Sequence, residues 1–239
     1  MQQETLANQT LLLATGSVAN RGWFDRDWLA QQQAVVGQSE GSGRNPALFL
    51  QLAGGAYVLR HYYRGGLPGR LIRDRYLWLG LTRTRAYQEL HLLEQLVALN
   101  LPVSKPVAAQ IVRVGGCYRA ELITERLQGC QDLIQWLQQR PLALAQWQAL
   151  GGVLARFHRH GVYHADLNGK NILFDGQQFY LIDFDRGALR APESRWQQAN
   201  LMRLARSFKK EQQRAPTLHW QIEDWHALQA AYQVAYQAP

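Results

Sequence analysis

The chain has 239 residues, and its 47% hydrophobic and 18% charged content is that of a soluble globular protein rather than an intrinsically disordered one. Its formal net charge is +8, and only four of its 26 basic residues are Lys. Because Arg binds phosphate and carboxylate groups in bidentate geometry, this excess favours anionic partners, although a net charge that serves only solubility gives the same composition.

Cysteine content and hydropathy indicate the cellular location expected for the chain. The two cysteines, Cys117 and Cys130, form no C-x-x-C arrangement, so we predict neither a disulfide framework nor a zinc site and expect a reducing cytosol. No stretch approaches the ~18 consecutive apolar residues that a membrane-spanning helix needs. Any membrane association is therefore expected to be peripheral.

The first third of the chain is predicted to be rich in strands. Within the first 20 residues we expect a polar tail and a short strand at 10–14, and a helix then starts at Asp25. Three strands follow, at 34–37, 47–53 and 56–62, with a hairpin turn at Gly54-Gly55 between the last two. The loop after the first of them contains Gly41 and Gly43, whose backbone N–H groups can approach phosphates closely. An ordinary hairpin loop would look the same, so this cofactor-binding prediction depends on the motifs that follow.

The third strand is the place where a kinase presents a cation to the nucleotide phosphates. Here Val58-Leu59-Arg60 puts Arg60 there in place of the usual Lys. His61 and Arg64 are neighbours that could share this role, and an edge-strand charge is the structural alternative. The acidic partner of the cation is expected on the next helix, with Glu89 as the candidate and Glu94 as its competitor.

A cluster of arginines lies between residues 60 and 85. It contains seven arginines against one acid, Asp74, with aromatic residues interleaved. Such a cluster is compatible with a nucleic-acid patch, an anionic membrane contact, a polyanionic substrate site or a solvated basic face. We assign substrate binding to four of its members: Arg64, Arg70, Arg73 and Arg75.

The remaining elements predict two lobes. A helix over 84–100 and two strands at 107–114 and 118–125 complete the first lobe, 1–126, and a connector leads into the second, 127–239. The second lobe is predicted to be mainly helical, with helices at 132–139, 142–160, 194–210 and 221–236. The predicted fold class is α+β, with an N-terminal antiparallel sheet, one main helix in that lobe and a mainly helical C-terminal lobe.

The central stretch of the second lobe carries the pattern H-x-D-x-x-x-x-N at His164, Asp166 and Asn171. In kinases this pattern forms the catalytic loop, where the Asp accepts the proton of the attacking hydroxyl. Asp166 is therefore the predicted base, and His164 is expected to brace the loop rather than to react. Lys170 is assigned to neutralise the transferring phosphoryl group, with a plain surface lysine as the alternative.

A second motif, Asp183-Phe184-Asp185, follows a predicted hairpin with its turn at Asp175-Gly176. Because the hairpin brings its two ends together, Asp166 and Asp183 are expected at the same end of the sheet. The oxygen atoms of Asn171 and Asp183 suit Mg²⁺, and Asp185 adds a second acid beside this site. The predicted cofactors are therefore ATP and Mg²⁺, with Asn171, Asp183 and Asp185 as metal ligands.

The order of these motifs resembles the protein-kinase-like fold, and more narrowly the bacterial 3-deoxy-D-manno-octulosonic acid (Kdo) kinases of lipopolysaccharide assembly. The passages that carry the resemblance are Val58–Gly66, Asp74–Trp78, His164–Asn168, Leu181–Gly187 and Trp196–Leu201. The resemblance implies ATP-dependent phosphorylation of the 4-hydroxyl of Kdo on a Kdo-lipid A precursor, at the cytoplasmic face of the inner membrane. It also implies that Arg at the third-strand position is normal in this family.

Other functions remain to be weighed against this one. A protein kinase needs an activation loop, and Ala191-Pro192-Glu193 lies too close to Asp185 to enclose one. An aminoglycoside kinase is disfavoured because its polycationic substrate calls for an acidic site, whereas a heptose kinase stays open.

A pseudokinase acting as a binding module has no need of Asp166, Asn171 and Asp183 together. A nucleic-acid-binding protein would explain the charge but not these acids, so we expect no nucleic-acid partner. The sequence does not predict the oligomeric state.

Overall fold

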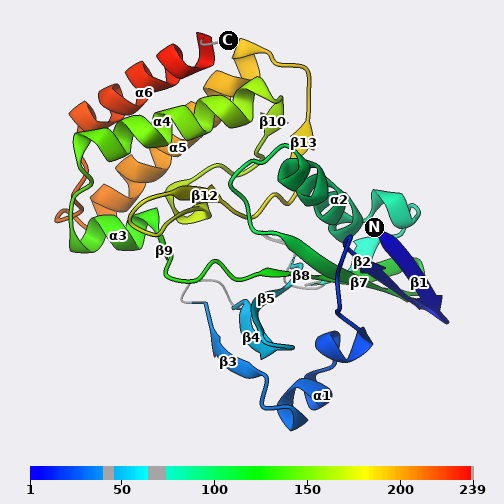
Figure 1. The fold of residues 1–239 in the computed structure, drawn as a ribbon. Helices are drawn as coiled ribbons and strands as arrows, with labels where there is room; N and C mark the ends of the chain where they lie inside the picture. The colour runs from blue at the N-terminus through cyan, green and yellow to red at the C-terminus, as the bar shows by residue number, and fades with distance from the viewer. Residues whose placement is uncertain (40–45, 64–73, 238–239) are drawn as a thin grey trace. The chain divides into compact units, whose positions relative to one another are not determined.

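The structure, a computed structural model (Figure 1), describes residues 1–39, 46–63 and 74–237. Of the predicted site residues, Gly41, Gly43, Arg64, Arg70 and Arg73 lie outside the described residues. The chain forms two compact units. The first contains residues 1–97 and 104–128, and the second contains residues 98–103 and 129–239.

The first unit is built on an antiparallel sheet. Its strands are β1 (Gln2–Leu6), β2 (Gln9–Leu13), β3 (Val35–Gln38), β4 (Leu48–Leu52), β5 (Gly55–His61), β6 (Tyr76–Leu77), β7 (Pro106–Val114) and β8 (Cys117–Glu125). They follow the order β1-β2-β7-β8-β5-β4-β3, and β6 pairs with β8. The helices of this unit are η1 (Arg21–Phe24), α1 (Arg26–Gln31), η3 (Leu81–Arg83) and α2 (Arg85–Ala98).

Two local predictions in this unit were wrong. The polar tail is in fact strand β1, which pairs with β2 through a turn in which Ala7 has a φ of +52°. Because every residue of β1 is exposed, the strand shows no apolar alternation in the sequence. The hairpin turn between β4 and β5 is at Ala53-Gly54, where both residues have positive φ, so it lies one residue earlier than predicted.

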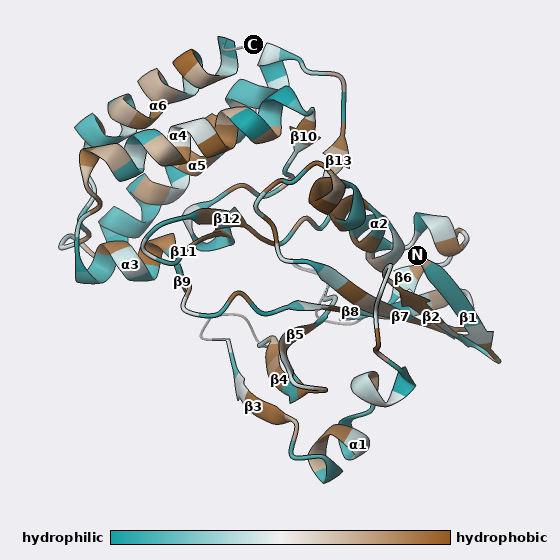
Figure 2. Cartoon of the chain, in the orientation of Figure 1, coloured by the Kyte–Doolittle hydropathy of each residue, from teal (hydrophilic) through white to brown (hydrophobic). Residues whose placement is uncertain are grey.

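Side-chain alternation along β5 separates the two faces of the sheet. Leu59 belongs to a core cluster with Trp23 and Phe24 of η1 and Leu29 of α1. Arg60, the next residue, contacts Glu89 of α2. Since successive strand residues point to opposite faces, η1 and α1 cover one face and α2 covers the other. The hydrophobic side of α2 is visible in Figure 2, and it includes the buried Leu90, Leu93 and Leu96.

The second unit is mainly helical. Its helices are α3 (Leu133–Gln139), α4 (Leu144–Arg159), α5 (Ser194–Arg214) and α6 (Ile222–Gln237), with the short η4 (Gly169–Asn171). Its strands are β9 (Gln131–Asp132), β10 (Val162–Tyr163), β11 (Ile172–Phe174), β12 (Phe179–Leu181) and β13 (Ala188–Leu189). These strands form a β12-β11-β9 sheet and a β10-β13 pair. The predicted α+β class, with its sheet-rich and helix-rich parts, is confirmed.

Two glycines, one within α4 and one at its end, position the segment that follows this helix. A Cβ on Gly151 would lie 2.3 Å from the Leu228 carbonyl oxygen, so this glycine lets α4 and α6 pack closely. Gly161 has a φ of +72° and ends α4 in the left-handed conformation that glycine tolerates. The chain then turns into β10 and the loop that carries Asp166. No helix among the described residues combines the length and apolarity needed to span a bilayer.

Candidate active site

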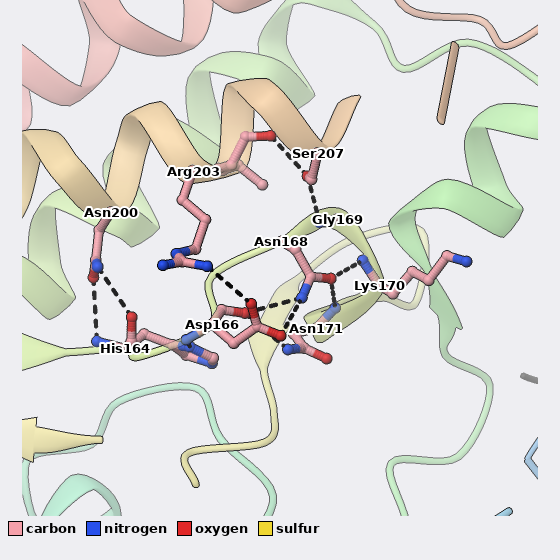
Figure 3. Close-up of polar contacts among 10 residues, drawn as sticks. His164, Asp166, Asn168, Gly169, Lys170, Asn171, Asn200, Arg203 and Ser207 are labelled. Carbon is pink, nitrogen blue, oxygen red and sulfur yellow. Dashed lines mark hydrogen bonds and ion pairs between the residues drawn. The ribbon is translucent and has the colours of Figure 1, made fainter. Parts of the chain in front are cut away.

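The loop between β10 and β11 is held in place by a helix that lies far along the chain. Asn200 of α5 accepts a hydrogen bond from the His164 backbone N–H (3.1 Å) and donates one to the His164 carbonyl oxygen (3.0 Å) (Figure 3). Asn200 is buried, with 2% exposure. A buried amide that satisfies two backbone groups fixes the start of the loop.

His164 is an internal brace of the same loop. Its Nδ1 accepts a hydrogen bond from the Asp166 backbone N–H (3.2 Å), and its Nε2 lies 3.0 Å from the Ile182 carbonyl oxygen. The first contact needs an acceptor and the second a donor, so the ring is the neutral Nε2–H tautomer. Burial lowers the pKa of His164, which keeps the ring neutral. This geometry supports the bracing role over a chemical one.

The Asp166 side chain is presented to solvent on this frame. Its side chain is 65% exposed, and its Oδ2 accepts a hydrogen bond from the Asn168 amide (3.1 Å). Asn168 also caps η4, because its Oδ1 accepts from the backbone N–H of Lys170 (2.9 Å) and of Asn171 (3.3 Å). Asp166 is therefore oriented by a neutral amide while its carboxylate stays exposed to solvent, and its role as the base stays a prediction.

Asn171 and Asp183 are brought together by the backbone. The Ile182 N–H donates to the Asn171 carbonyl oxygen (3.0 Å). Asp183 is the next residue after Ile182, so this bond holds it near Asn171. The Asn171 side-chain NH₂ donates to the Asp166 carbonyl oxygen (2.9 Å), which orients the amide so that Oδ1 serves as an acceptor. Asp183 has a φ of +63°, a left-handed conformation that costs a non-glycine residue energy and is typical of functional sites.

The oxygen atoms predicted to bind a metal suit Mg²⁺ better than a metal ion that is coordinated by protein side chains alone. Among the described residues, no three or more His, Cys, Asp and Glu side chains gather as a metal-binding group. Mg²⁺ is commonly held by one or two protein oxygens together with substrate phosphates and water. Asn171 and Asp183 supply such oxygens. Asp185 follows the buried Phe184, and its assignment as a third ligand stays a prediction.

Lys170 lies on the same loop but faces an acid of α5. Its Nζ is 3.7 Å from Glu211 Oε1, and its side chain is 51% exposed. Glu211 also binds Arg214 at 3.0 Å. The role of Lys170 at the transferring phosphoryl group stays a prediction.

From Asn200 to Glu211, one face of α5 contacts the catalytic loop. No role for this face was predicted from the sequence. Besides Asn200, Ser207 accepts a hydrogen bond from the Gly169 N–H (3.0 Å), and Arg203 NH1 lies 3.4 Å from Asp166 Oδ1 (Figure 3). With Glu211 these residues recur at intervals of three and four. The available signal was a polar stripe at helical spacing beside the apolar residues of the same helix.

The first unit holds the predicted phosphate-binding cation. Arg60 NH2 lies 2.5 Å from Glu89 Oε1, and the Tyr62 hydroxyl donates to Glu89 Oε2 (2.6 Å). Glu89 is buried at 3% exposure, whereas the Arg60 side chain keeps 27%. The Arg60 guanidinium also lies over the Tyr62 ring, 5.0 Å from its centroid. The ion pair is thus present, and its role toward a nucleotide stays a prediction.

The competing residues are engaged elsewhere. Glu94 accepts hydrogen bonds from the Thr15 N–H (2.9 Å) and hydroxyl (3.0 Å). Partial burial opposes ionisation of Glu94, but these bonds and the nearby N-terminal ammonium outweigh it and hold its pKa below the usual value. His61 lies beside Glu121 (3.2 Å) on the other face of the strand. Neither residue takes the place of its predicted counterpart.

The arginine cluster divides into structural and exposed members where it is described. Arg85 donates to the Tyr76 hydroxyl (2.7 Å) and lies over the Tyr76 ring, 5.0 Å from its centroid. Arg75 and Arg83 are exposed. Arg75 is therefore the one predicted substrate-binding arginine whose surroundings the structure describes, and its role stays a prediction.

Comparison with solved structures identifies the fold. The chain matches WaaP, solved in complex with acyl carrier protein, with a TM-score of 0.59 and 21% identity over 94% of this chain and 88% of that one. It matches a glucosamine kinase with a TM-score of 0.54 and 13% identity over 97% and 68% of the two chains. Both likenesses show a protein-kinase-like fold.

Comparison of sequences is more specific. A 3-deoxy-D-manno-octulosonic acid kinase of Xanthomonas axonopodis pv. citri (strain 306) is 46% identical over 78% of this chain and 79% of its own. The protein of the same name from Vibrio vulnificus (strain CMCP6) is 41% identical over 88% of each chain. The model of the lipopolysaccharide kinase (Kdo/WaaP) family matches residues 26–232. The predicted family is thus confirmed, and the chain belongs to the lipopolysaccharide kinase (Kdo/WaaP) family.

Proposed function

We propose that this protein is an ATP-dependent sugar kinase that phosphorylates the 4-hydroxyl of Kdo on a Kdo-lipid A precursor, in lipopolysaccharide inner-core biosynthesis. The observation that carries the proposal is the 41–46% identity, over most of the chain, to proteins named 3-deoxy-D-manno-octulosonic acid kinase. The loop geometry supports the same chemistry, because an exposed carboxylate on a braced loop is what transfer to a hydroxyl requires.

Each charged group then has a defined task. Asp166 accepts the proton of the sugar hydroxyl as the hydroxyl attacks the γ-phosphorus of ATP, and the bond from that phosphorus to the leaving ADP oxygen breaks. The oxygens of Asn171 and Asp183 would hold Mg²⁺, which would offset negative charge on the phosphates. Arg60, held by Glu89 at 2.5 Å, contacts the phosphates of ATP from the first unit. His164, Asn168 and Asn200 keep the loop in its productive conformation.

Transfer of ³²P from γ-labelled ATP tests the acceptor. Three acceptors are compared in the presence of Mg²⁺: Kdo-lipid A precursor, lipid A precursor without Kdo, and a heptosylated core. We expect label only where an unphosphorylated Kdo is present, and NMR of the product then locates the phosphate. Label on the heptosylated core alone would assign the protein as a heptose kinase. ATP binding without transfer to any of the three would favour the binding-module alternative.

We also propose that the protein works at the cytoplasmic face of the inner membrane and contacts it through residues 75–79. Leu77 and Leu79 are 62% and 59% exposed, which is unusual for two leucines so close together. Trp78 between them lies under the exposed Arg113, whose guanidinium is 4.7 Å from the ring centroid. Exposed leucines beside Trp and Arg suit the boundary between acyl chains and anionic headgroups.

Vesicle co-sedimentation tests this contact. The double variant Leu77→Ser/Leu79→Ser should bind vesicles with anionic lipid at least about tenfold more weakly, because tenfold needs only about 1.4 kcal/mol and each leucine contributes about 1.5–3 kcal/mol when fully buried. Leu144→Ser is the matched control, since Leu144 is 63% exposed but lies in the second unit. Equal binding of the double variant and the wild type would refute the assigned surface.

A further inference from the structure

The stripe of α5 that faces the catalytic loop contains one residue whose contact differs from the rest. Asn200 and Ser207 bind main-chain groups of His164 and Gly169 and so hold the loop. Arg203 instead reaches the side chain of Asp166, with NH1 3.4 Å from Oδ1 (Figure 3). It therefore lies beside the proposed base rather than beneath the loop.

Stability does not account for this arginine. The Arg203 side chain is 47% exposed and that of Asp166 is 65% exposed. An ion pair so open to solvent contributes little to the free energy of unfolding. Among the described residues Asp166 is the one hydrogen-bond or ion-pair partner of this guanidinium, which carries several N–H donors in a planar fork.

The chemistry of the reaction indicates what those donors bind. The hydroxyl that Asp166 deprotonates must come within hydrogen-bond distance of its carboxylate. Any group close to that hydroxyl on the sugar then lies within reach of Arg203. In Kdo the carboxylate is attached to the ring carbon two positions from the carbon that bears the 4-hydroxyl. A planar guanidinium is the side chain best matched to a carboxylate.

We propose that Arg203 binds the carboxylate of the acceptor sugar beside Asp166 and so selects an acidic sugar over a neutral one. This inference rests on the proposed function, because it uses Asp166 as the base and Kdo as the acceptor. The positive charge of Arg203 is not cancelled by the acid on the same stripe. Glu211 is already engaged by Lys170 (3.7 Å) and Arg214 (3.0 Å).

A comparison of two acceptors isolates this contact. The steady-state kcat/KM for phosphoryl transfer is measured with Kdo-lipid A precursor and with its Kdo carboxyl methyl ester, for the wild type, Arg203→Gln and Arg203→Lys. A charge-assisted hydrogen bond corresponds to about a 10- to 100-fold effect on kcat/KM. We expect esterification to cost the wild type that factor. Arg203→Gln should lose a similar factor with the acid and show no further loss with the ester, and Arg203→Lys should be intermediate.

Arg195→Gln is the matched control. Arg195 is an exposed arginine two turns earlier on α5, so its substitution removes the same charge from the same helix at a distance from Asp166. This variant should discriminate acid from ester as the wild type does. Thermal unfolding of Arg203→Gln should match the wild type, since the replaced side chain is exposed.

The outcomes separate this inference from the function on which it rests. If Arg203→Gln still discriminates the acid from the ester as strongly as the wild type, the carboxylate is bound elsewhere and the inference is wrong, while the kinase assignment stands. If the wild type transfers no phosphate to Kdo-lipid A precursor, the proposed function itself fails. Loss of discrimination in Arg203→Gln alone would establish Arg203 as the residue that recognises the acidic sugar.

Discussion

Arg60 in the first unit and Asp166 in the second are held by opposite means. Arg60 is tied to a fully buried carboxylate, Glu89, which a tyrosine hydroxyl also binds. Asp166 stands on a loop that neutral groups brace. Its own side chain is 65% exposed, and the arginine that contacts it, Arg203, is itself 47% exposed. The carboxylate that fixes Arg60 is buried, whereas the carboxylate of Asp166 is exposed to solvent.

The difference follows from what each group must do. A cation that binds phosphates needs a fixed position, and a buried acid provides it at the cost of desolvating a charge. A base must exchange a proton with a substrate hydroxyl, so its loop is held by hydrogen bonds while its carboxylate stays exposed instead of being buried against a counter-ion. Substitution of Asp166 should therefore change the chemistry without changing stability, whereas substitution of Glu89 should damage both together.

The largest effect is expected at the exposed base. Asp166→Asn should lower kcat by about 10²–10⁴, the range that general-base catalysis contributes. Because the side chain is exposed, the free energy of unfolding should change by no more than about 0.5 kcal/mol. Stopped assays for labelled product, with urea unfolding in parallel, test both parts. Turnover at the wild-type rate would remove Asp166 from the mechanism.

The buried acid of the first unit should behave differently. Glu89→Gln keeps the shape but removes the charge that holds Arg60, so we expect the KM for ATP to rise and the free energy of unfolding to fall by about 1–3 kcal/mol. Glu94→Gln is the matched control on the same helix, and its KM for ATP should stay unchanged. An equal rise in the KM for ATP in both variants would contradict the difference described between the two units.

The residues that the sequence predicted best are those joined by short stretches of chain. Asp166, Asn171 and Asp183 lie within one loop and one hairpin, so their spacing alone brings them together. Glu89 and Glu94 share one helix, and the sequence did not establish which of them faces β5. Asn200 lies 36 residues from His164, the residue it fixes, and no local pattern reveals such a contact. Strand β1 was missed because an exposed edge strand has no apolar periodicity.

The frame of the second unit can be tested apart from the base. Asn200→Ala leaves the backbone N–H and C=O of His164 without their partner, which should cost about 1–3 kcal/mol of unfolding free energy and lower kcat about tenfold through a displaced loop. Gln197→Ala is the matched control. Gln197 is another buried amide of α5, but it binds the His158 carbonyl oxygen (3.2 Å) and the Tyr236 hydroxyl (2.9 Å). This control should lose stability and keep kcat, and a similar kcat loss in both variants would contradict the bracing role of Asn200.

The last prediction concerns pH, and it arises from two buried histidines of the second unit. Burial lowers the pKa of His158 to about 4 and also lowers that of His164. A histidine whose pKa is lower in the folded chain takes up its proton preferentially in the unfolded chain. The free energy of unfolding should therefore be complete above about pH 6.5 and fall below it, by at most about 1.4 kcal/mol per pH unit for each histidine, until the pKa of that histidine in the folded chain is reached. Urea unfolding at pH 7.5, 6.5, 5.5 and 4.5 measures this slope.

The variant His158→Gln assigns the two contributions. Its slope should be smaller than that of the wild type but not zero, because His164 still resists protonation behind its bonds to the Asp166 N–H and the Ile182 carbonyl oxygen. A variant with no remaining slope would mean that His164 takes up a proton equally well in the folded and unfolded chains. The ring could not then be the neutral brace inferred from its contacts, and the orientation of Asp166 would have to rest on its contacts with Asn168, Asn171 and Arg203.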